Sequence, residues 1–208
     1  MNSNNQSPIK SIENYYSNKI RQYGNTPKGV DWKDDSSQLI RFVQVLKIID
    51  RDNNFTINDL GCGYGALYQF MKNKYKNFQY HGIDISKNMI ESALSNLKFD
   101  NASFEISNTP ESIADYSVAS GIFNVKLNAN NNDWLSYIKK TLEIMNKKSI
   151  KGFSFNCLSI YSDKDKMRDD LYYADPLILF DYLKKEYSKN VSLLHDYNLY
   201  EFTMLVKK

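Results

Sequence analysis

Three glycines at alternate positions, Gly61, Gly63 and Gly65, lie between a predicted strand and a predicted helix. Glycine lets the backbone turn tightly and approach a ligand closely, and a nucleotide-binding loop requires this strand, loop and helix context. From residue 55 onward, short apolar runs alternate with amphipathic stretches, which indicates βαβ units and a parallel sheet. The sequence therefore predicts an α/β fold with a ligand-binding loop after the first strand.

The hydrophobic pattern predicts the order of the other elements. An amphipathic helix over 9–23 and a second helix that begins after Asp35 or Ser36 precede the sheet. The pattern then predicts strands near 55–60, 79–84, 102–107, 116–123 and 150–157, helices near 64–75, 87–98, 132–146 and 177–187, and a final hairpin formed by 191–195 and 199–206. We expect a single domain at 36–208, preceded by a helical cap segment at 1–35.

The composition narrows the class of partner. The chain has 27 Lys and Arg against 24 Asp and Glu, and these charges are scattered, so no basic footprint for nucleic acid is visible. Cys62 and Cys157 lack the spacing of a metal site or a disulfide framework, and no apolar run approaches the length of a membrane span. We expect a cytoplasmic protein with a small-molecule substrate, no metal, and neither nucleic acid nor membrane as partner.

Two acidic residues indicate which ligand the glycine loop holds. Asp84 ends the second predicted strand about twenty positions after Gly65, where a carboxylate can accept both hydroxyls of an adenosine ribose. Asp59 stands two positions before Gly61, close to the predicted helix N-terminus. A carboxylate there suits the cationic sulfonium and ammonium of S-adenosylmethionine and opposes a pyrophosphate.

An NAD-binding loop is the alternative, because Gly61, Gly63 and Ala66 also fit the relaxed dinucleotide fingerprint. Three features oppose an NAD-binding loop: Asp59, the two helices that precede the loop, and the antiparallel hairpin that closes the sheet. A tight turn without any ligand also stays open.

The segments 59–65, 82–86 and 115–121 resemble the first, second and fourth motifs of class I S-adenosylmethionine-dependent methyltransferases. The resemblance covers roughly 36–208 and extends to uncharacterised bacterial members that act on small molecules. It implies a Rossmann-like, seven-stranded and mostly parallel sheet with helices on both faces and an antiparallel C-terminal hairpin. It also implies S-adenosyl-L-methionine as the cofactor.

The resemblance assigns cofactor contacts to residues of this chain. Asp59, Gly61 and Gly63 would line the methionine end of the cofactor, Asp84 would bind the ribose, and Ile85 would pack on the adenine. Asn108 would meet the adenine amino group, at a position where many members carry Asp, and Gly121 would contact the cofactor after the fourth strand. Arg41, with Gln38 nearby, would reach the cofactor carboxylate.

Substrate residues are expected where segments can fold over the carboxyl ends of the strands. The long connection 159–175 is interpreted either as a lid or as a solvated loop. The aromatic side chains of the N-terminal segment are interpreted either as a cap over the site or as part of the core. The aromatic candidates are Tyr15, Tyr16, Tyr23, Trp32, Tyr161 and Tyr173. Asn124 is the candidate for positioning the substrate, and His195, in the turn of the hairpin, is the candidate general base.

These observations predict an enzyme that transfers a methyl group in line to a small metabolite. The acceptor would be an oxygen or nitrogen of a sugar intermediate or an amino-acid derivative. Three alternatives stay open: a nucleic-acid or protein methyltransferase that relies on a partner, a cofactor-binding module without catalysis, and an NAD-dependent enzyme.

Overall fold

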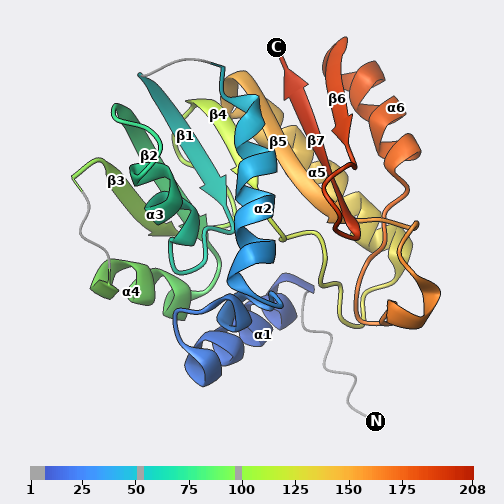
Figure 1. The fold of residues 1–208 in the computed structure, drawn as a ribbon, viewed down its shortest axis with the longest axis horizontal. Coiled ribbons are helices and arrows are strands. Elements are labelled where there is room, and N and C mark those ends of the chain that lie inside the picture. Colours follow the sequence, from blue (N-terminus) through green and yellow to red (C-terminus); the bar gives the residue numbers. More distant parts are fainter. Residues whose placement is uncertain (1–7, 51–53, 97–99) are drawn as a thin grey trace.

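The computed structural model describes residues 8–50, 54–96 and 100–208, and within them a seven-stranded sheet forms the centre. The strands follow the order β3, β2, β1, β4, β5, β7, β6 across the sheet (Figure 1). Their bounds are β1 Phe55–Leu60, β2 Phe78–Asp84, β3 Ala102–Ile106, β4 Ala114–Ala119, β5 Ser149–Leu158, β6 Asn190–Leu194 and β7 Glu201–Lys207. Strands β1 to β5 pair in parallel, and β7 is antiparallel to β5 and β6, which confirms the predicted sheet and its C-terminal hairpin.

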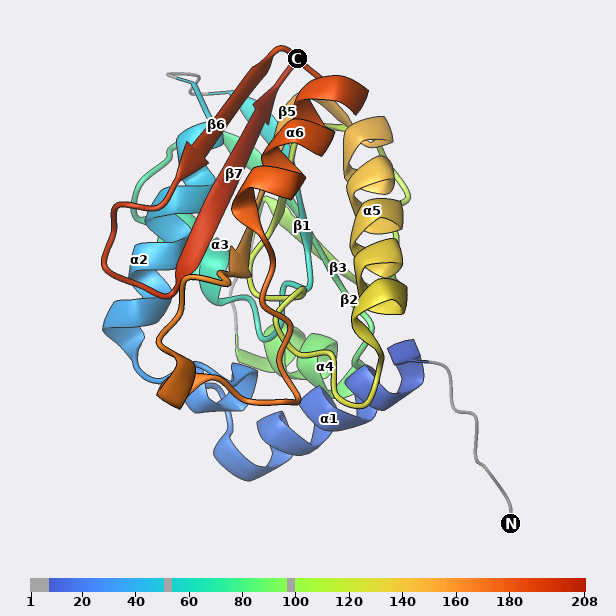
Figure 2. The ribbon, with the colours of Figure 1, turned by 90° about the vertical axis from the view of Figure 1, so that its right-hand side faces the viewer.

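Helices cover both faces of the sheet, as predicted (Figure 2). One face carries α2 and α3, and the other carries α5 and α6. The helices are α1 Pro8–Tyr23, α2 Asp35–Val45, α3 Ala66–Lys72, α4 Lys87–Asn96, α5 Asn131–Lys147 and α6 Pro176–Glu186, with short 3-10 turns η1 Pro27–Val30, η2 Leu46–Ile48 and η3 Lys164–Lys166. The last residues of the predicted helix 87–98 lie outside the described residues.

Some boundaries differ from the prediction for local reasons. Helix α2 begins earlier because the Asp34 carboxylate accepts a hydrogen bond from the Ser37 backbone N–H at 2.8 Å and so caps it. Helix α3 begins later because Gly65 has a φ of +83°, outside helical geometry. Strand β4 ends at Ala119 rather than at residue 123, and the chain turns at Gly121 with a φ of +89°.

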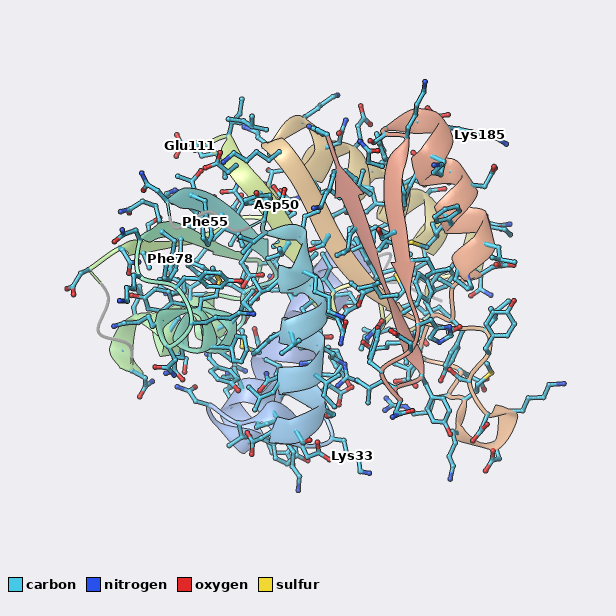
Figure 3. All side chains as sticks on the ribbon, turned by 45° about the horizontal axis from the view of Figure 1, so that its top comes forward. Lys33, Asp50, Phe55, Phe78, Glu111 and Lys185 are labelled. Atoms are coloured by element: carbon cyan, nitrogen blue, oxygen red, sulfur yellow. The ribbon has the colours of Figure 1, made fainter. Side chains whose placement is uncertain are left out.

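Apolar packing on each side of the sheet stabilises this arrangement. On the α2 and α3 side, aromatic rings dominate, and those of Phe55 and Phe78 stack with centroids 5.9 Å apart (Figure 3). On the other side, Phe155 and its neighbours pack against Leu142 of α5 and Leu183 of α6. Phe155, Leu142 and Leu183 are fully buried, and full burial of such a side chain contributes about 1.5–3 kcal/mol.

The N-terminal helix α1 lies across the carboxyl ends of the parallel strands, next to α4 (Figure 1). Two buried hydroxyls, Ser17 and Ser86, hydrogen-bond at 2.8 Å between these helices, and Arg21 donates to Asn88 at 3.1 Å. The segment before α2 therefore covers the edge where ligands of α/β sheets bind. None of the described helices is long and apolar enough to cross a membrane.

Candidate active site

A cleft with about 980 Å³ of atom-free space, counting the part that opens to solvent, lies between the carboxyl ends of β1, β2 and β4 and the N-terminal segment. It is formed by residues far apart in the chain, from Ile12 on α1 to Thr141 on α5. The residues predicted as ligand contacts that line it are Asp59, Gly61, Gly63, Asp84, Ile85, Asn108, Gly121, Tyr16 and Trp32. The structure thus brings together every predicted cofactor contact except Arg41.

The backbone of the glycine loop is held by the end of β2. The N–H groups of Gly61 and Cys62 both donate to the Ile83 carbonyl, at 2.7 and 3.0 Å, and the Gly63 N–H donates to the Asp84 carboxylate at 2.9 Å. These bonds fix the backbone of the loop against the end of β2. The carboxyls of Asp59 and Asp84 also line the cleft here, and negative charge at this place opposes a pyrophosphate.

Glycine is required at the start of this loop by both geometry and space. Gly61 has a φ of +75°, and a Cβ there would lie 2.1 Å from Cγ2 of Ile122. The loop after β4 therefore packs directly on the glycine loop, and both border the cleft.

Asp84 is placed to bind a pair of hydroxyls. One carboxylate oxygen accepts from the Gly63 N–H and the other from the Ser86 N–H at 2.8 Å, which fixes the group while each oxygen keeps a lone pair for a ligand. Burial raises the pKa of the Asp84 carboxyl to about 6, against the lowering effect of these backbone hydrogen bonds. The carboxyl is thus mostly ionised at neutral pH.

Asp59 is buried at the base of the cleft, where the Tyr80 hydroxyl donates a 2.5 Å hydrogen bond to its carboxylate. The pKa of the Asp59 carboxyl is raised to about 7, mainly by burial; the Tyr80 hydrogen bond opposes this rise and the Asp84 charge adds to it. A cation bound nearby would favour the ionised form. Tyr80 was not predicted from the sequence, although an inward-facing tyrosine on a buried strand usually needs a hydrogen-bond partner.

The structure does not bring Arg41 to the cleft, so its predicted contact with the cofactor carboxylate is not supported. Its guanidinium is buried and forms two contacts with the Glu201 carboxylate, at 2.8 and 2.9 Å. The same group stacks on the Trp32 ring with its central carbon 4.0 Å from the centroid. Arg41 thereby supports Trp32, which in turn covers Gly121, where a Cβ would lie 2.4 Å from the indole.

Gln38, one helical turn before Arg41, lines the cleft instead. Its side-chain oxygen accepts a hydrogen bond from the Tyr64 hydroxyl at 3.4 Å. Among the described residues, its amide nitrogen has no hydrogen-bond partner, so it is free to donate to a ligand carboxylate.

The structure does not bring the two predicted catalytic residues to the cleft. The Asn124 side chain is used internally, because its oxygen accepts from the Leu158 N–H at 3.0 Å and its nitrogen donates to Glu201 at 3.2 Å. His195 is exposed, and its ring lies beside those of Tyr161 and Phe202, with the ring centroids 6.2 Å apart in each pair. The turn that carries His195 is at the expected edge, but β5 and β7 separate β6 from the strands that form the cleft.

Only two of the six aromatic substrate candidates line the cleft, Tyr16 and Trp32. The Tyr15 hydroxyl donates to Asp31 at 2.8 Å, and the Tyr173 hydroxyl accepts from the Arg168 N–H at 2.9 Å. Tyr23 and Tyr161 are exposed by 38% and 61%. Tyr137 of α5 also lines the cleft and was not predicted from the sequence.

The comparisons with known proteins identify the class. A methyltransferase-domain family matches residues 51–170, and a Mycobacterium tuberculosis protein provisionally named as a methyltransferase, Rv1506c, is 52% identical over 166 residues, 78% of this chain and 99% of that protein. The chain belongs to this methyltransferase family and is an S-adenosylmethionine-dependent enzyme.

Solved structures confirm the fold. Magnesium protoporphyrin IX methyltransferase from Synechocystis PCC 6803 with bound S-adenosylmethionine has a TM-score of 0.68 at 12% identity, over 100% of both chains. The N-methyltransferase NodS from Bradyrhizobium japonicum WM9, in complex with S-adenosyl-L-homocysteine, has a TM-score of 0.65 at 13% identity, over 98% of this chain and 99% of its own. The Rossmann-like methyltransferase fold predicted from the sequence is therefore correct.

Proposed function

We propose that this enzyme methylates a small metabolite without net negative charge, bound in the cleft beside the cofactor. The observation that carries this proposal is the charge of the lining: among the described residues it contains the carboxyls of Asp59 and Asp84 and no Lys, Arg or His. S-adenosylmethionine has one net positive charge, so the two ionised carboxylates would outweigh it. An anionic acceptor would then find repulsion and no counter-charge.

The cofactor would occupy the half of the cleft built by the glycine loop and the end of β2. Asp59 would face its ammonium and sulfonium, Asp84 its ribose hydroxyls, and Gln38 its carboxylate. Ile85 and Asn108 line the part of the cleft beyond Asp84, where the adenine would lie. These roles agree with the chemistry of each side chain, since carboxylates meet cations and hydroxyls, and an amide donor meets a carboxylate.

The acceptor would lie between the loop after β4 and the aromatic residues Tyr16, Trp32 and Tyr137. Burial raises the pKa of the Tyr16 and Tyr137 hydroxyls, so both stay protonated and can hydrogen-bond an acceptor without acting as bases near neutral pH. Bound cofactor supplies an electrophilic methyl group on sulfur. The side chains around it contribute alignment and exclusion of water, which can supply most of the rate enhancement of such a displacement.

The cations near Tyr15, the neighbour of Tyr16 in the chain, do not reverse this charge pattern. Arg168 lies close to the Tyr15 hydroxyl, but its guanidinium is already paired with the Asp170 carboxylate through contacts of 2.9 and 2.5 Å. Lys19 forms a 2.6 Å ion pair with Asp31. A nucleic acid would need unpaired cations to hold its phosphates.

Transfer of a radioactive methyl group tests the proposal. The protein is incubated with methyl-labelled cofactor and a cell extract of its source organism, which is then separated into protein, RNA and three small-molecule pools by charge. We expect the label in the neutral or cationic small-molecule pool, and none with the Asp84→Ala variant. Label in RNA, in protein or in the anionic pool contradicts the proposal.

A further inference from the structure

Tyr80 has a position that the cofactor assignment does not by itself explain. Its side chain is fully buried on β2, between the rings of Tyr68 and Phe104, with centroids 5.3 and 5.7 Å away. Its hydroxyl reaches Oδ2 of Asp59 at 2.5 Å. A phenol placed in an aromatic core with its one polar atom on a carboxylate is fixed in orientation on every side.

The Asp59 carboxylate has few other partners. Within the described parts of the chain, Tyr80 is the only side chain or backbone group that donates a hydrogen bond to it. Oδ1, the other carboxylate oxygen, is left for the cleft that Asp59 lines. Tyr80 therefore determines which carboxylate oxygen is presented to a ligand.

We infer that Tyr80 is a positioning residue that keeps the Asp59 carboxylate ionised and turned toward the cleft, and that it thereby sets the affinity for ligands with a cationic methionine end. The inference rests on the proposed placement of Asp59 at that end of the cofactor. A buried carboxylate without a donor would be protonated over more of the neutral range, and a neutral carboxyl attracts a cation far less.

The electrostatic surroundings of Asp59 support this role. The groups that face it are the Tyr80 hydroxyl from β2, the Asp84 carboxyl at the end of β2 and the Cys62 thiol of the glycine loop. Burial and the Asp84 charge both raise the pKa of Asp59, and the Tyr80 hydrogen bond is the one contribution that lowers it. Loss of the hydroxyl alone should therefore shift ionisation of Asp59 to higher pH.

The variant Tyr80→Phe tests the inference because it removes the hydroxyl and keeps the ring. We expect its affinity for S-adenosylmethionine to be at least about eightfold below that of the unaltered enzyme at pH 6.5 and within about fourfold at pH 8.5, since a hydrogen bond to a charged group is worth about one to two pKa units. Calorimetric titration at both pH values gives the two affinity ratios. Tyr68→Phe is the matched control: it removes a hydroxyl bonded to Asn101 in the same aromatic cluster, and we expect equal affinity at both pH values.

The neutral ligand 5′-methylthioadenosine, which keeps the adenosine and lacks the methionine end, separates this role from a structural one. We expect Tyr80→Phe to leave its affinity unchanged within about twofold, because the ligand carries no cation for Asp59. The role of Tyr80 would be overturned if the affinity ratio of Tyr80→Phe to the unaltered enzyme for S-adenosylmethionine did not change with pH. It would also be overturned if the variant lost affinity equally for both ligands. If the unaltered enzyme itself bound S-adenosylmethionine with no dependence on pH across neutrality, the placement of Asp59 would fail instead.

Discussion

The Asp84→Ala variant is expected to bind S-adenosylmethionine more than roughly a hundredfold more weakly than the unaltered enzyme. The carboxylate has a lone pair on each oxygen for the two ribose hydroxyls, and a hydrogen bond to a charged group is worth about 1.5–3 kcal/mol. Calorimetric titration at pH 7.5, where the Asp84 carboxyl with its pKa of about 6 is ionised, measures the change.

A comparison of ligands shows whether that loss comes from the ribose. Asp84→Ala should weaken S-adenosylmethionine and 5′-methylthioadenosine alike, because both carry the ribose. Asp59→Asn should weaken the binding of S-adenosylmethionine and leave that of 5′-methylthioadenosine unchanged, because only S-adenosylmethionine has the cationic methionine end. Unchanged affinity of the Asp84 variant for both ligands would remove the ribose assignment.

The Arg41→Ala variant is expected to lower the free energy of unfolding by about 3–5 kcal/mol, since it leaves the carboxylate of Glu201 buried without its counter-charge. Glu201 is 1% exposed and Arg41 8%, so water cannot replace the lost partner without rearrangement. Denaturation by urea, followed by circular dichroism, measures the change in unfolding free energy. The same substitution should raise the KM for the acceptor, because Trp32 loses the guanidinium on which it stacks.

Two further variants make the Arg41 experiment specific. Lys185→Ala breaks an exposed ion pair with Asp181 and should leave the denaturation midpoint unchanged. The double variant Arg41→Met with Glu201→Gln removes both charges and should recover much of the lost stability. A single Arg41→Ala variant as stable as the unaltered protein would show that the buried pair does not hold α2 to β7.

The sheet and the cofactor loop were predictable because both depend on local patterns. Alternating apolar runs gave the strands and their order along the chain, and the glycine loop with Asp59 and Asp84 lies within two consecutive strands and the connection through α3. In a parallel sheet those strand ends meet at one edge. Asn108 and Gly121 were assigned by the resemblance to the family, and they line the cleft because they follow β3 and β4 at the same edge.

Residues whose roles depend on distant partners could not be assigned from the sequence. Arg41 appears there as a polar residue at a helix start, and nothing near it indicates Glu201, 160 positions later. Asn124 likewise follows a strand as a substrate residue would, yet its side chain bonds to Leu158 and Glu201. His195 lies at the predicted edge of the sheet, but its distance from the cleft depends on the strand order, which puts β5 and β7 between them.

The cleft is expected to bind a cationic adenosyl ligand rather than a dinucleotide. A calorimetric titration of the purified protein with S-adenosylmethionine and, separately, with NAD distinguishes the two. The structure predicts one saturable site for S-adenosylmethionine and no heat of binding for NAD, because the carboxyls of Asp59 and Asp84 line the cleft and would repel a pyrophosphate. Saturable binding of NAD with no response to S-adenosylmethionine would contradict the claim.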